Sequence, residues 1–245
     1  MRRFGLIGRP LGHSASAKHF SAKFEREGLT DCAFELYELP SIEALPELLA
    51  RVPELEGFNV TIPYKREVMR YLDALSDDAA KIGAVNCVRR SSDGRLTGHN
   101  TDIVGLRLAL DELLEGSEPE HALVLGTGGA SQAVQYALAE RGIAFDLVSR
   151  DAAKGNYTYD NLPVEVVAES KLIINATPVG TYPDVEAAPR IPYAYVTPDH
   201  RLLDLVYNPP VTQFLAYGLQ RGARVLNGER MFLGQAAAGW KIWNE

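Results

Sequence analysis

The sequence is poor in cysteine and in positive charge, and each shortage excludes a class of protein. Cys32 and Cys87 are the only cysteines among 245 residues, and no second ligand residue lies near either. Neither a disulfide framework nor a zinc site is therefore indicated, and we expect two buried, reduced thiols. The 25 lysines and arginines are outnumbered by 32 acidic residues, for a net charge of -7. This balance disfavours nucleic-acid binding as a main activity.

Long apolar runs and targeting segments are also lacking. The opening residues MRRFGLIGRP are basic, but Gly5, Gly8 and Pro10 interrupt their apolar stretch, which is unlike a secretory signal. No other apolar run is long enough to cross a bilayer. We expect a cytoplasmic protein with neither a membrane nor a nucleic-acid partner.

The composition is that of a globular protein, with 46% hydrophobic and 23% charged residues, and the length suits two compact lobes or one large α/β domain. Short apolar runs alternate with helical patterns, which indicates β-α units around a largely parallel sheet. One such pattern is the three- and four-residue spacing of Ile103, Leu106, Leu110 and Leu113. The predicted strands are 3–7, 33–37, 58–62, 84–90, 122–125, 145–149, 172–175, 202–206 and 224–226.

Two features divide the chain. The residues SSDG at 91–94 predict a hairpin, and so an antiparallel element in the first half. A helix is expected to begin after the NTD triplet and to end at Gly116, before SEPEH leads into a new strand. We therefore expect a first domain at 1–101, completed by a C-terminal helix at 231–245, and a second at 102–230.

A glycine turn opens the second half. In HALVLGTGGASQAVQYAL, three glycines, Gly126, Gly128 and Gly129, stand between an apolar strand and a helix rich in alanine, and Ser131 replaces the usual third glycine of the motif. Such a turn lets backbone N–H groups approach a pyrophosphate at the positive end of the helix. Glycine turns also join strands to helices for steric reasons alone.

The end of the next strand indicates which dinucleotide binds. An NAD site usually has an acid there, whereas this chain has Ser149 and Arg150, and a guanidinium suits the 2′-phosphate of NADP. Lys154 is a second candidate cation. A solvated arginine at a strand end is the alternative interpretation.

Polar side chains gather at predicted element ends in the first half. The motif GFNVTIPYK supplies Asn59, Thr61 and Lys65, while GAVNCV and GHNTD add Asn86 and Asp102. Amides, hydroxyls, one lysine and one carboxylate suit a polyhydroxylated small molecule.

Two serines near the N-terminus precede a predicted helix. Ser14 and Ser16 follow a loop rich in glycine and proline. They could seat a carboxylate at the helix start, or Ser16 could serve only as an N-cap.

Eight motifs together carry a resemblance that spans the chain. GLIGRPLGHSAS, GFNVTIPYK, IGAVNCV, GHNTDIVG, VLGTGGAS, INATPVG, DLVYNP and NGERMFLGQAA, in this order, resemble the shikimate dehydrogenase family. The resemblance implies an N-terminal α/β substrate lobe with a mainly parallel sheet, a C-terminal Rossmann-type, doubly wound NADP-binding lobe, and a cleft between them. It also implies reversible reduction of 3-dehydroshikimate to shikimate, in chorismate and aromatic amino acid biosynthesis.

The resemblance further implies roles for individual residues. Ser14, Ser16 and the Tyr207 hydroxyl would hold the substrate carboxylate. The ring hydroxyls would be bound by Thr61, Lys65, Asn86, Asp102 and Gln235. NADP would contact Gly126, Thr127, Gly128, Gly129, Ala130, Ser149, Arg150, Lys154, the backbone at Leu205, and Gly228. A dimer is a family expectation, so monomer and homodimer both stay open.

The reaction needs a proton as well as a hydride. NADPH would supply the hydride, and the ammonium of Lys65 would stabilise the developing alkoxide. Proton transfer through the Lys65 and Asp102 pair would complete the reduction, with Asp102 orienting the ammonium.

The chain departs from the family pattern at three places. Ala17 and Phe20 replace a proline and a histidine that we expect to serve in packing. Arg230 replaces a glycine of the NGERMFLGQ motif, and it would either touch the cofactor or lie in solvent. The segment 151–170 is short, so the helix after the cofactor-selecting strand is expected to be curtailed or missing.

Two other functions compete with the main interpretation. One is a dehydrogenase with relaxed use of quinate or NAD, because the same polar residues could admit one more hydroxyl. The other is a nucleotide-sensing protein without turnover, against which the retention of both Lys65 and Asp102 speaks.

Overall fold

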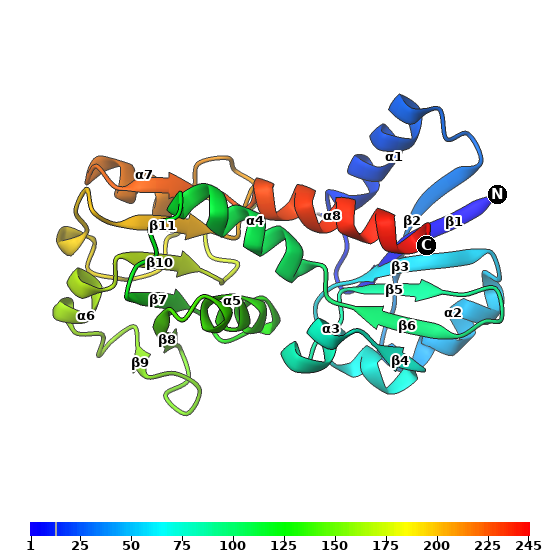
Figure 1. Cartoon of the computed structure of the whole chain (residues 1–245), viewed down its shortest axis with the longest axis horizontal. Helices are drawn as coiled ribbons and strands as arrows, with labels where there is room; N and C mark the ends of the chain where they lie inside the picture. The colour runs from blue at the N-terminus through cyan, green and yellow to red at the C-terminus, as the bar shows by residue number, and fades with distance from the viewer. Residues whose placement is uncertain (13) are drawn as a thin grey trace. The chain divides into compact units, whose positions relative to one another are not determined.

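The computed structural model describes residues 1–12 and 14–245, so His13, within the first serine motif, lies outside the described residues. The chain divides into two compact units. The first comprises Met1–Thr101 and Ala236–Glu245, and the second comprises Asp102–Gln235. Each unit is built around a six-stranded sheet (Figure 1).

The first unit has a mixed sheet. Its strands are β1 (Arg2–Gly8), β2 (Cys32–Glu38), β3 (Leu55–Val60), β4 (Ala74–Leu75), β5 (Cys87–Arg90) and β6 (Leu96–His99). Its helices are α1 (Ser16–Glu27), α2 (Leu45–Arg51), α3 (Asp77–Ile82) and the end of α8 (Glu229–Trp243), with 3-10 turns η1 (Ile42–Ala44) and η2 (Glu67–Tyr71). The strand order is β2-β1-β3-β5-β6-β4. β1 pairs in parallel with β2 and β3, whereas β5 runs antiparallel to β3 and β6, so the predicted hairpin is confirmed.

An aromatic cluster joins α1 and the end of α8 to this sheet. Phe20 stacks on Phe34 with ring centres 4.5 Å apart, and Trp243 stacks on Phe4 at 5.1 Å. The indole Nε1 of Trp243 also donates to the carbonyl of Val88 over 3.0 Å. Phe20 therefore has a packing role, and the end of α8 belongs to the core of the first unit.

The second unit has a wholly parallel sheet. Its strands are β7 (His121–Leu125), β8 (Ala144–Ser149), β9 (Tyr157–Thr158), β10 (Leu172–Asn175), β11 (Arg201–Asp204) and β12 (Arg224–Leu226). Its helices are α4 (Asp102–Leu114), α5 (Gly129–Glu140), α6 (Val164–Glu169), α7 (Gln213–Gln220) and the start of α8, with the 3-10 turn η3 (Tyr193–Tyr195). The order β12-β11-β10-β7-β8-β9, with every neighbouring pair parallel, is the doubly wound order of dinucleotide-binding folds. The predicted α/β fold class is confirmed.

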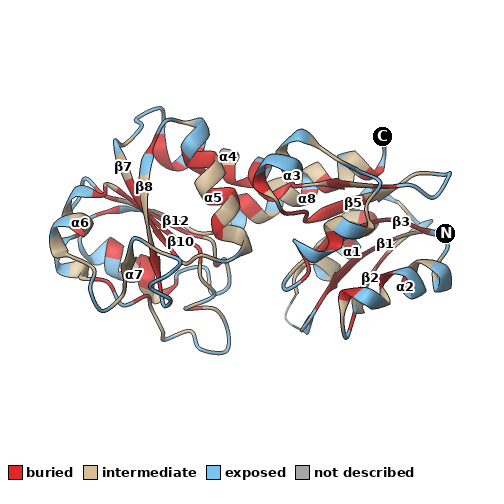
Figure 2. Ribbon diagram, turned by 90° about the horizontal axis from the view of Figure 1, so that it is seen from below, coloured by how far each residue is buried: buried red, intermediate tan, exposed pale blue. Residues whose placement is uncertain are grey.

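Burial explains why these segments form these elements. Figure 2 shows the buried positions along the strands and on one side of several helices. In α4, the four apolar residues Ile103, Leu106, Leu110 and Leu113 are each at most 1% exposed, as their spacing predicts. Helices with one apolar stripe fold because that stripe is removed from water against a sheet.

Several details of the prediction need correction. The strand expected at 84–90 begins only at Cys87, because the N–H of Val85 bonds the carbonyl of Lys65 over 2.7 Å instead of a strand neighbour. The strand expected at 58–62 ends at Val60. Cys87 is buried as expected, but Cys32 is only half-buried.

The segment after β8 is short, as predicted. Residues 150–156 contain turns and bends but no helix, and α6 has only six residues. Two neighbouring parallel strands, β8 and β9, are therefore joined without a crossover helix. In the part of the chain that the structure describes, no helix combines the length and the apolar character that a membrane span requires.

Candidate active site

Thr61 of the first unit lies where β1 and β3 end. The N–H of Thr61 donates to the carbonyl of Ile7 over 2.9 Å. Gly8 leaves room for this contact, because a Cβ at that position would lie 2.3 Å from the Cγ2 of Thr61. The loop that carries Ser14 and Ser16 therefore starts beside Thr61.

Backbone and amide hydrogen bonds connect the segments that carry Lys65, Asn86 and Thr101. The carbonyl of Lys65 accepts from the N–H of Val85 at 2.7 Å. The side chain of Asn86 accepts from the N–H of Thr101 at 2.6 Å and donates to its hydroxyl at 3.1 Å. Asn86 and Thr101 are buried, and Asp102 is the next residue in the chain. A lysine, an amide and a hydroxyl are thus held on connected segments.

Helix α1 begins one residue earlier than an N-cap at Ser16 would require. The N-cap of α1 is Ala15, and Ser16 is the first helical residue. The hydroxyl of Ser14 accepts from the N–H of Ser16 over 3.3 Å. The interpretation of Ser16 as an N-cap is therefore wrong, and both serines are half-buried at the helix start.

The glycine turn of the second unit has the shape that a pyrophosphate needs. Gly126 has a φ of 102°, and a Cβ there would lie 2.7 Å from the Cγ2 of Thr177. Gly128 is the N-cap of α5, and a Cβ at this position would meet nothing within 4 Å. The N-terminus of a 12-residue helix therefore opens onto unfilled space. These residues fit the phosphates of a dinucleotide.

Hydroxyl groups connect the glycine turn to the end of β8. The hydroxyls of Thr127 and Ser149 are 3.2 Å apart, and the Ser149 hydroxyl accepts from the N–H of Asp151 at 3.1 Å. Arg150, which lies between Ser149 and Asp151 in the sequence, is exposed. The ammonium of Lys154 lies 3.3 Å from the Asp151 carboxylate. Asp151 was not predicted to have a role, although an acid directly after Arg150 is a signal that the sequence contains.

A buried carboxylate organises the ends of β10 and β11. Asp204 accepts from the amide of Asn175 at 2.9 Å, from the N–H of Val206 at 3.0 Å and from the hydroxyl of Thr212 at 2.5 Å. Burial raises the pKa of Asp204 to about 6. These strand ends carry the motifs INATPVG and DLVYNP, but no role was predicted for Asp204. The sequence feature that could have identified Asp204 is an acid at the end of an apolar strand.

The predicted contacts at Leu205 and Gly228 lie next to one another. A Cβ at Gly228 would stand 2.2 Å from the carbonyl oxygen of Leu205, and the N–H of Gly228 donates to Val206 over 3.1 Å. Nearby in the sequence, the ring of Tyr207 stacks on Phe232 at 4.8 Å. Glycine at 228 is therefore required by the close approach of two backbone segments.

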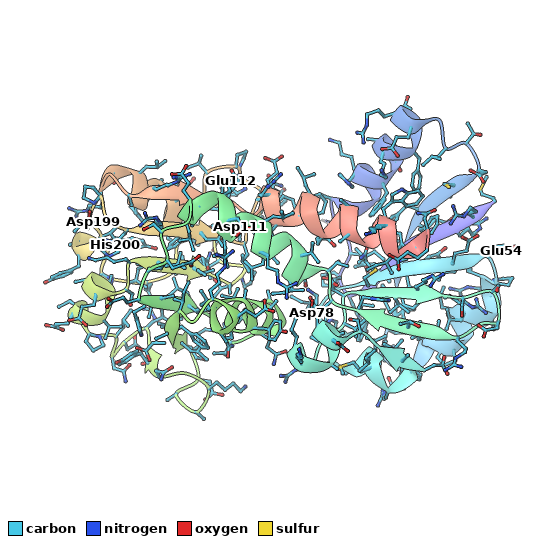
Figure 3. All side chains as sticks on the ribbon, in the orientation of Figure 1. Glu54, Asp78, Asp111, Glu112, Asp199 and His200 are labelled. Atoms are coloured by element: carbon cyan, nitrogen blue, oxygen red, sulfur yellow. The ribbon has the colours of Figure 1, made fainter. Side chains whose placement is uncertain are left out.

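Arg230 points toward α4. Its Nε lies 3.3 Å from the Glu112 carboxylate, and both side chains are about half exposed. Figure 3 labels Glu112 on α4. Of the two alternatives for Arg230, the structure favours solvent exposure, in an ion pair. Gln235 lies on α8 and is half-buried.

Comparison with known proteins covers almost the whole chain. The family described as "Shikimate dehydrogenase substrate binding domain" matches residues 6–88. The shikimate dehydrogenase (NADP(+)) of Clostridium beijerinckii is 38% identical over 255 residues, which cover 100% of this chain and 93% of that protein.

Solved structures give the same result. The shikimate 5-dehydrogenase of Thermus thermophilus, in complex with NADP(H) and shikimate, matches with a TM-score of 0.85 and 35% identity, over 99% of this chain and 93% of that one. The quinate dehydrogenase of Corynebacterium glutamicum, in complex with NAD, matches with a TM-score of 0.86 and 27% identity, over 99% and 93% of the two chains. With these identities over nearly its full length, the chain belongs to the shikimate dehydrogenase family.

Proposed function

We propose that this protein is an NADP-dependent shikimate dehydrogenase, an oxidoreductase that reversibly reduces 3-dehydroshikimate to shikimate in aromatic amino acid biosynthesis. The observation that carries the proposal is that this member of the family has two ordered sites, one in each unit. Connected segments of the first unit hold Lys65, Asn86 and Thr101, and the second unit has an open glycine turn at the start of α5.

The substrate is proposed to bind through groups that match its chemistry. Ser14 and Ser16, at the start of α1, bind the carboxylate with the Tyr207 hydroxyl, because a helix N-terminus favours negative charge. Thr61, Asn86 and Gln235 bind ring hydroxyls through groups that both donate and accept. Asn86 is already oriented by its bonds to Thr101.

Lys65 and Asp102 are proposed to be the catalytic residues. NADPH, when bound, supplies the hydride. The Lys65 ammonium stabilises the negative charge that develops on the ketone oxygen and provides its proton, while Asp102 orients the ammonium and the hydroxyl. Asp102 is mostly buried, with 8% of its surface exposed, and a carboxylate in such a position interacts strongly with a nearby cation.

The cofactor is proposed to bind along the carboxyl ends of β7 and β8. The backbone from Gly126 to Ala130 takes the pyrophosphate, and Ser149 and Arg150 take the 2′-phosphate. The backbone at Leu205 also contacts the cofactor, and Gly228 lies near the nicotinamide. Lys154 is the second proposed phosphate ligand, although its ammonium is already paired with Asp151.

Neither alternative function is favoured. The quinate dehydrogenase is 27% identical to this chain, against 35% and 38% for the two shikimate dehydrogenases. A nucleotide sensor has no need of the polar groups around Lys65. We propose that the enzyme works in the cytoplasm, as a monomer or homodimer, on small molecules alone.

A matrix of four assays tests the proposal. Absorbance at the nicotinamide band gives kcat/KM for shikimate and quinate, each with NADP and with NAD. The proposal expects shikimate with NADP to be the best pair. A preference for quinate with NAD would indicate the first alternative, and bound cofactor without turnover would indicate a sensor.

A further inference from the structure

An acidic group stands where the 2′-phosphate of NADP is to be recognised. Asp151 directly follows Arg150 at the end of β8, the second strand of the dinucleotide-binding unit. Its backbone N–H donates to the Ser149 hydroxyl at 3.1 Å, and that hydroxyl lies 3.2 Å from the hydroxyl of Thr127 in the glycine turn. Two short contacts therefore connect Asp151 to the glycine turn.

The Asp151 carboxylate is held in one position by its own turn. One oxygen accepts from the N–H of Ala153 at 3.0 Å, and the other lies 3.3 Å from the ammonium of Lys154. The hydrogen bond from Ala153, followed by that from Lys154, holds the pKa of Asp151 below its usual range. The group is therefore a fixed negative charge at neutral pH, beside Arg150.

No crossover helix follows β8 at residues 150–156. Residues 150–156 form turns, and Gly155 packs against the strand, where a Cβ would lie 2.9 Å from the carbonyl of Leu147. Asp151 and Lys154 therefore stay within one tight turn next to β8. In dinucleotide-binding units an acid in this region favours the ribose hydroxyls of NAD, whereas a cation favours the phosphate of NADP.

We propose that Asp151 is a specificity-determining residue, which weakens NADP binding by opposing the 2′-phosphate, and that Lys154 acts mainly by neutralising Asp151 and not as an independent phosphate ligand. The proposal rests on the NADP-dependent function above. A 2′-phosphate carries close to two negative charges at neutral pH, so one fixed carboxylate on the neighbouring turn opposes it. Arg150, Lys154 and Asp151 together carry a net charge near +1.

Asp151→Asn isolates the charge, because an asparagine oxygen can still accept from the N–H of Ala153. We expect the Kd of adenosine 2′,5′-bisphosphate, measured by calorimetry, to fall by about 5- to 10-fold in this variant. The Kd of AMP, which lacks the 2′-phosphate, should change by less than about twofold. The NADP to NAD ratio of kcat/KM should rise in parallel.

A double-mutant cycle separates the two roles of Lys154. If Lys154 only neutralises Asp151, the two charge effects cancel, and the double variant Asp151→Asn/Lys154→Gln binds the bisphosphate about as tightly as the wild type. A double variant that binds much more weakly than the wild type would show a direct phosphate ligand and overturn the second half of the proposal.

Glu118→Gln is the matched control for net charge. It also removes one negative charge from the second unit, but Glu118 precedes the amino end of β7 and pairs with Arg141. We expect it to leave the bisphosphate Kd unchanged. A bisphosphate Kd that is the same in Asp151→Asn and in the wild type, in an enzyme that still oxidises shikimate with NADP, would overturn this proposal and leave the proposed function intact. An enzyme that uses NADP with neither shikimate nor quinate would instead overturn the proposed function.

Discussion

The buried carboxylate of Asp204 should make the second unit less stable as the pH rises. Burial is the main cause that raises its pKa from 3.8 to about 6, against the opposing hydrogen bonds from Thr212, Val206 and Asn175. Between these two values, the folded protein keeps a proton that the unfolded chain has released. The contribution of Asp204 to stability is therefore fully present below the unfolded value of 3.8 and is lost as the pH rises through about 6.

The size of the effect follows from the two pKa values. The interval from 3.8 to about 6 corresponds to about 3 kcal/mol, because each tenfold change in proton affinity is worth about 1.4 kcal/mol. Asp204→Asn has no titrating group at this position. Its free energy of unfolding relative to the wild type should therefore rise by about 2.5 kcal/mol between about pH 4 and about pH 7, with the remainder below about pH 4.

The assay must report on the second unit alone. Both tryptophans, Trp240 and Trp243, belong to the first unit, so their fluorescence is unsuitable. Hydrogen exchange of the buried amides in β10 and β11 gives the free energy of unfolding of the second unit. Urea unfolding followed by circular dichroism, which reports on both units, gives the value for the whole chain. Other titrating groups, such as His200, occur in both proteins and cancel in the difference.

Asp184→Asn is the control for this experiment. Asp184 lies in an exposed loop after β10, so its substitution should leave the pH dependence unchanged. A difference between Asp204→Asn and the wild type that stays constant from about pH 4 to about pH 7 would refute the reasoning, because it would mean that folding does not change the pKa of this carboxyl group.

Three further substitutions test other parts of the molecule. Lys65→Ala should lower kcat by on the order of 10²- to 10⁴-fold with little change in KM; steady-state kinetics with near wild-type turnover would remove Lys65 from the mechanism. Arg230→Ala should change the Kd of NADP by less than about twofold, because the side chain pairs with Glu112 at the surface; a larger loss in calorimetry would place it at the cofactor. Gly105→Ala should destabilise the protein by about 1 to 3 kcal/mol in thermal unfolding despite a better helix propensity. A Cβ there would stand 2.1 Å from the carbonyl of Met231, and an unchanged Tm would show that α4 and α8 can separate at no cost.

The strands that the sequence predicts well are those with a strong local signal. β10 and β12 have the predicted bounds, Leu172–Asn175 and Arg224–Leu226, because each is a short apolar run with turn or polar residues around it. β4 and β9 were not predicted. Each has two residues, Ala74–Leu75 and Tyr157–Thr158, and exists only through pairing with a neighbouring strand. No local pattern encodes such pairing.

The same distinction applies to the candidate site. The glycine turn was predictable because Gly126 and Gly128 have a local steric purpose, a positive φ in one case and an open N-cap in the other. The bonding partners of Asp204 were not predictable, because its partner Asn175 is 29 residues away. The direction of Arg230 depended in the same way on Glu112 in another helix. Long-range partners decide what a polar residue does once it is at a strand end.

Two buried asparagines show how an acidic chain can present sites for anions. Asn86 fixes the backbone at Thr101, and Asn175 fixes the loop after β10 through Thr177 and Asp204. An amide can donate and accept at once without carrying charge, so both strand ends are ordered with no added electrostatic cost. With a net charge of -7, the chain has no general attraction for anions. Its attraction must come from single cations at strand ends, such as Arg150 after β8, which is why one carboxylate beside such a cation is expected to change cofactor choice measurably.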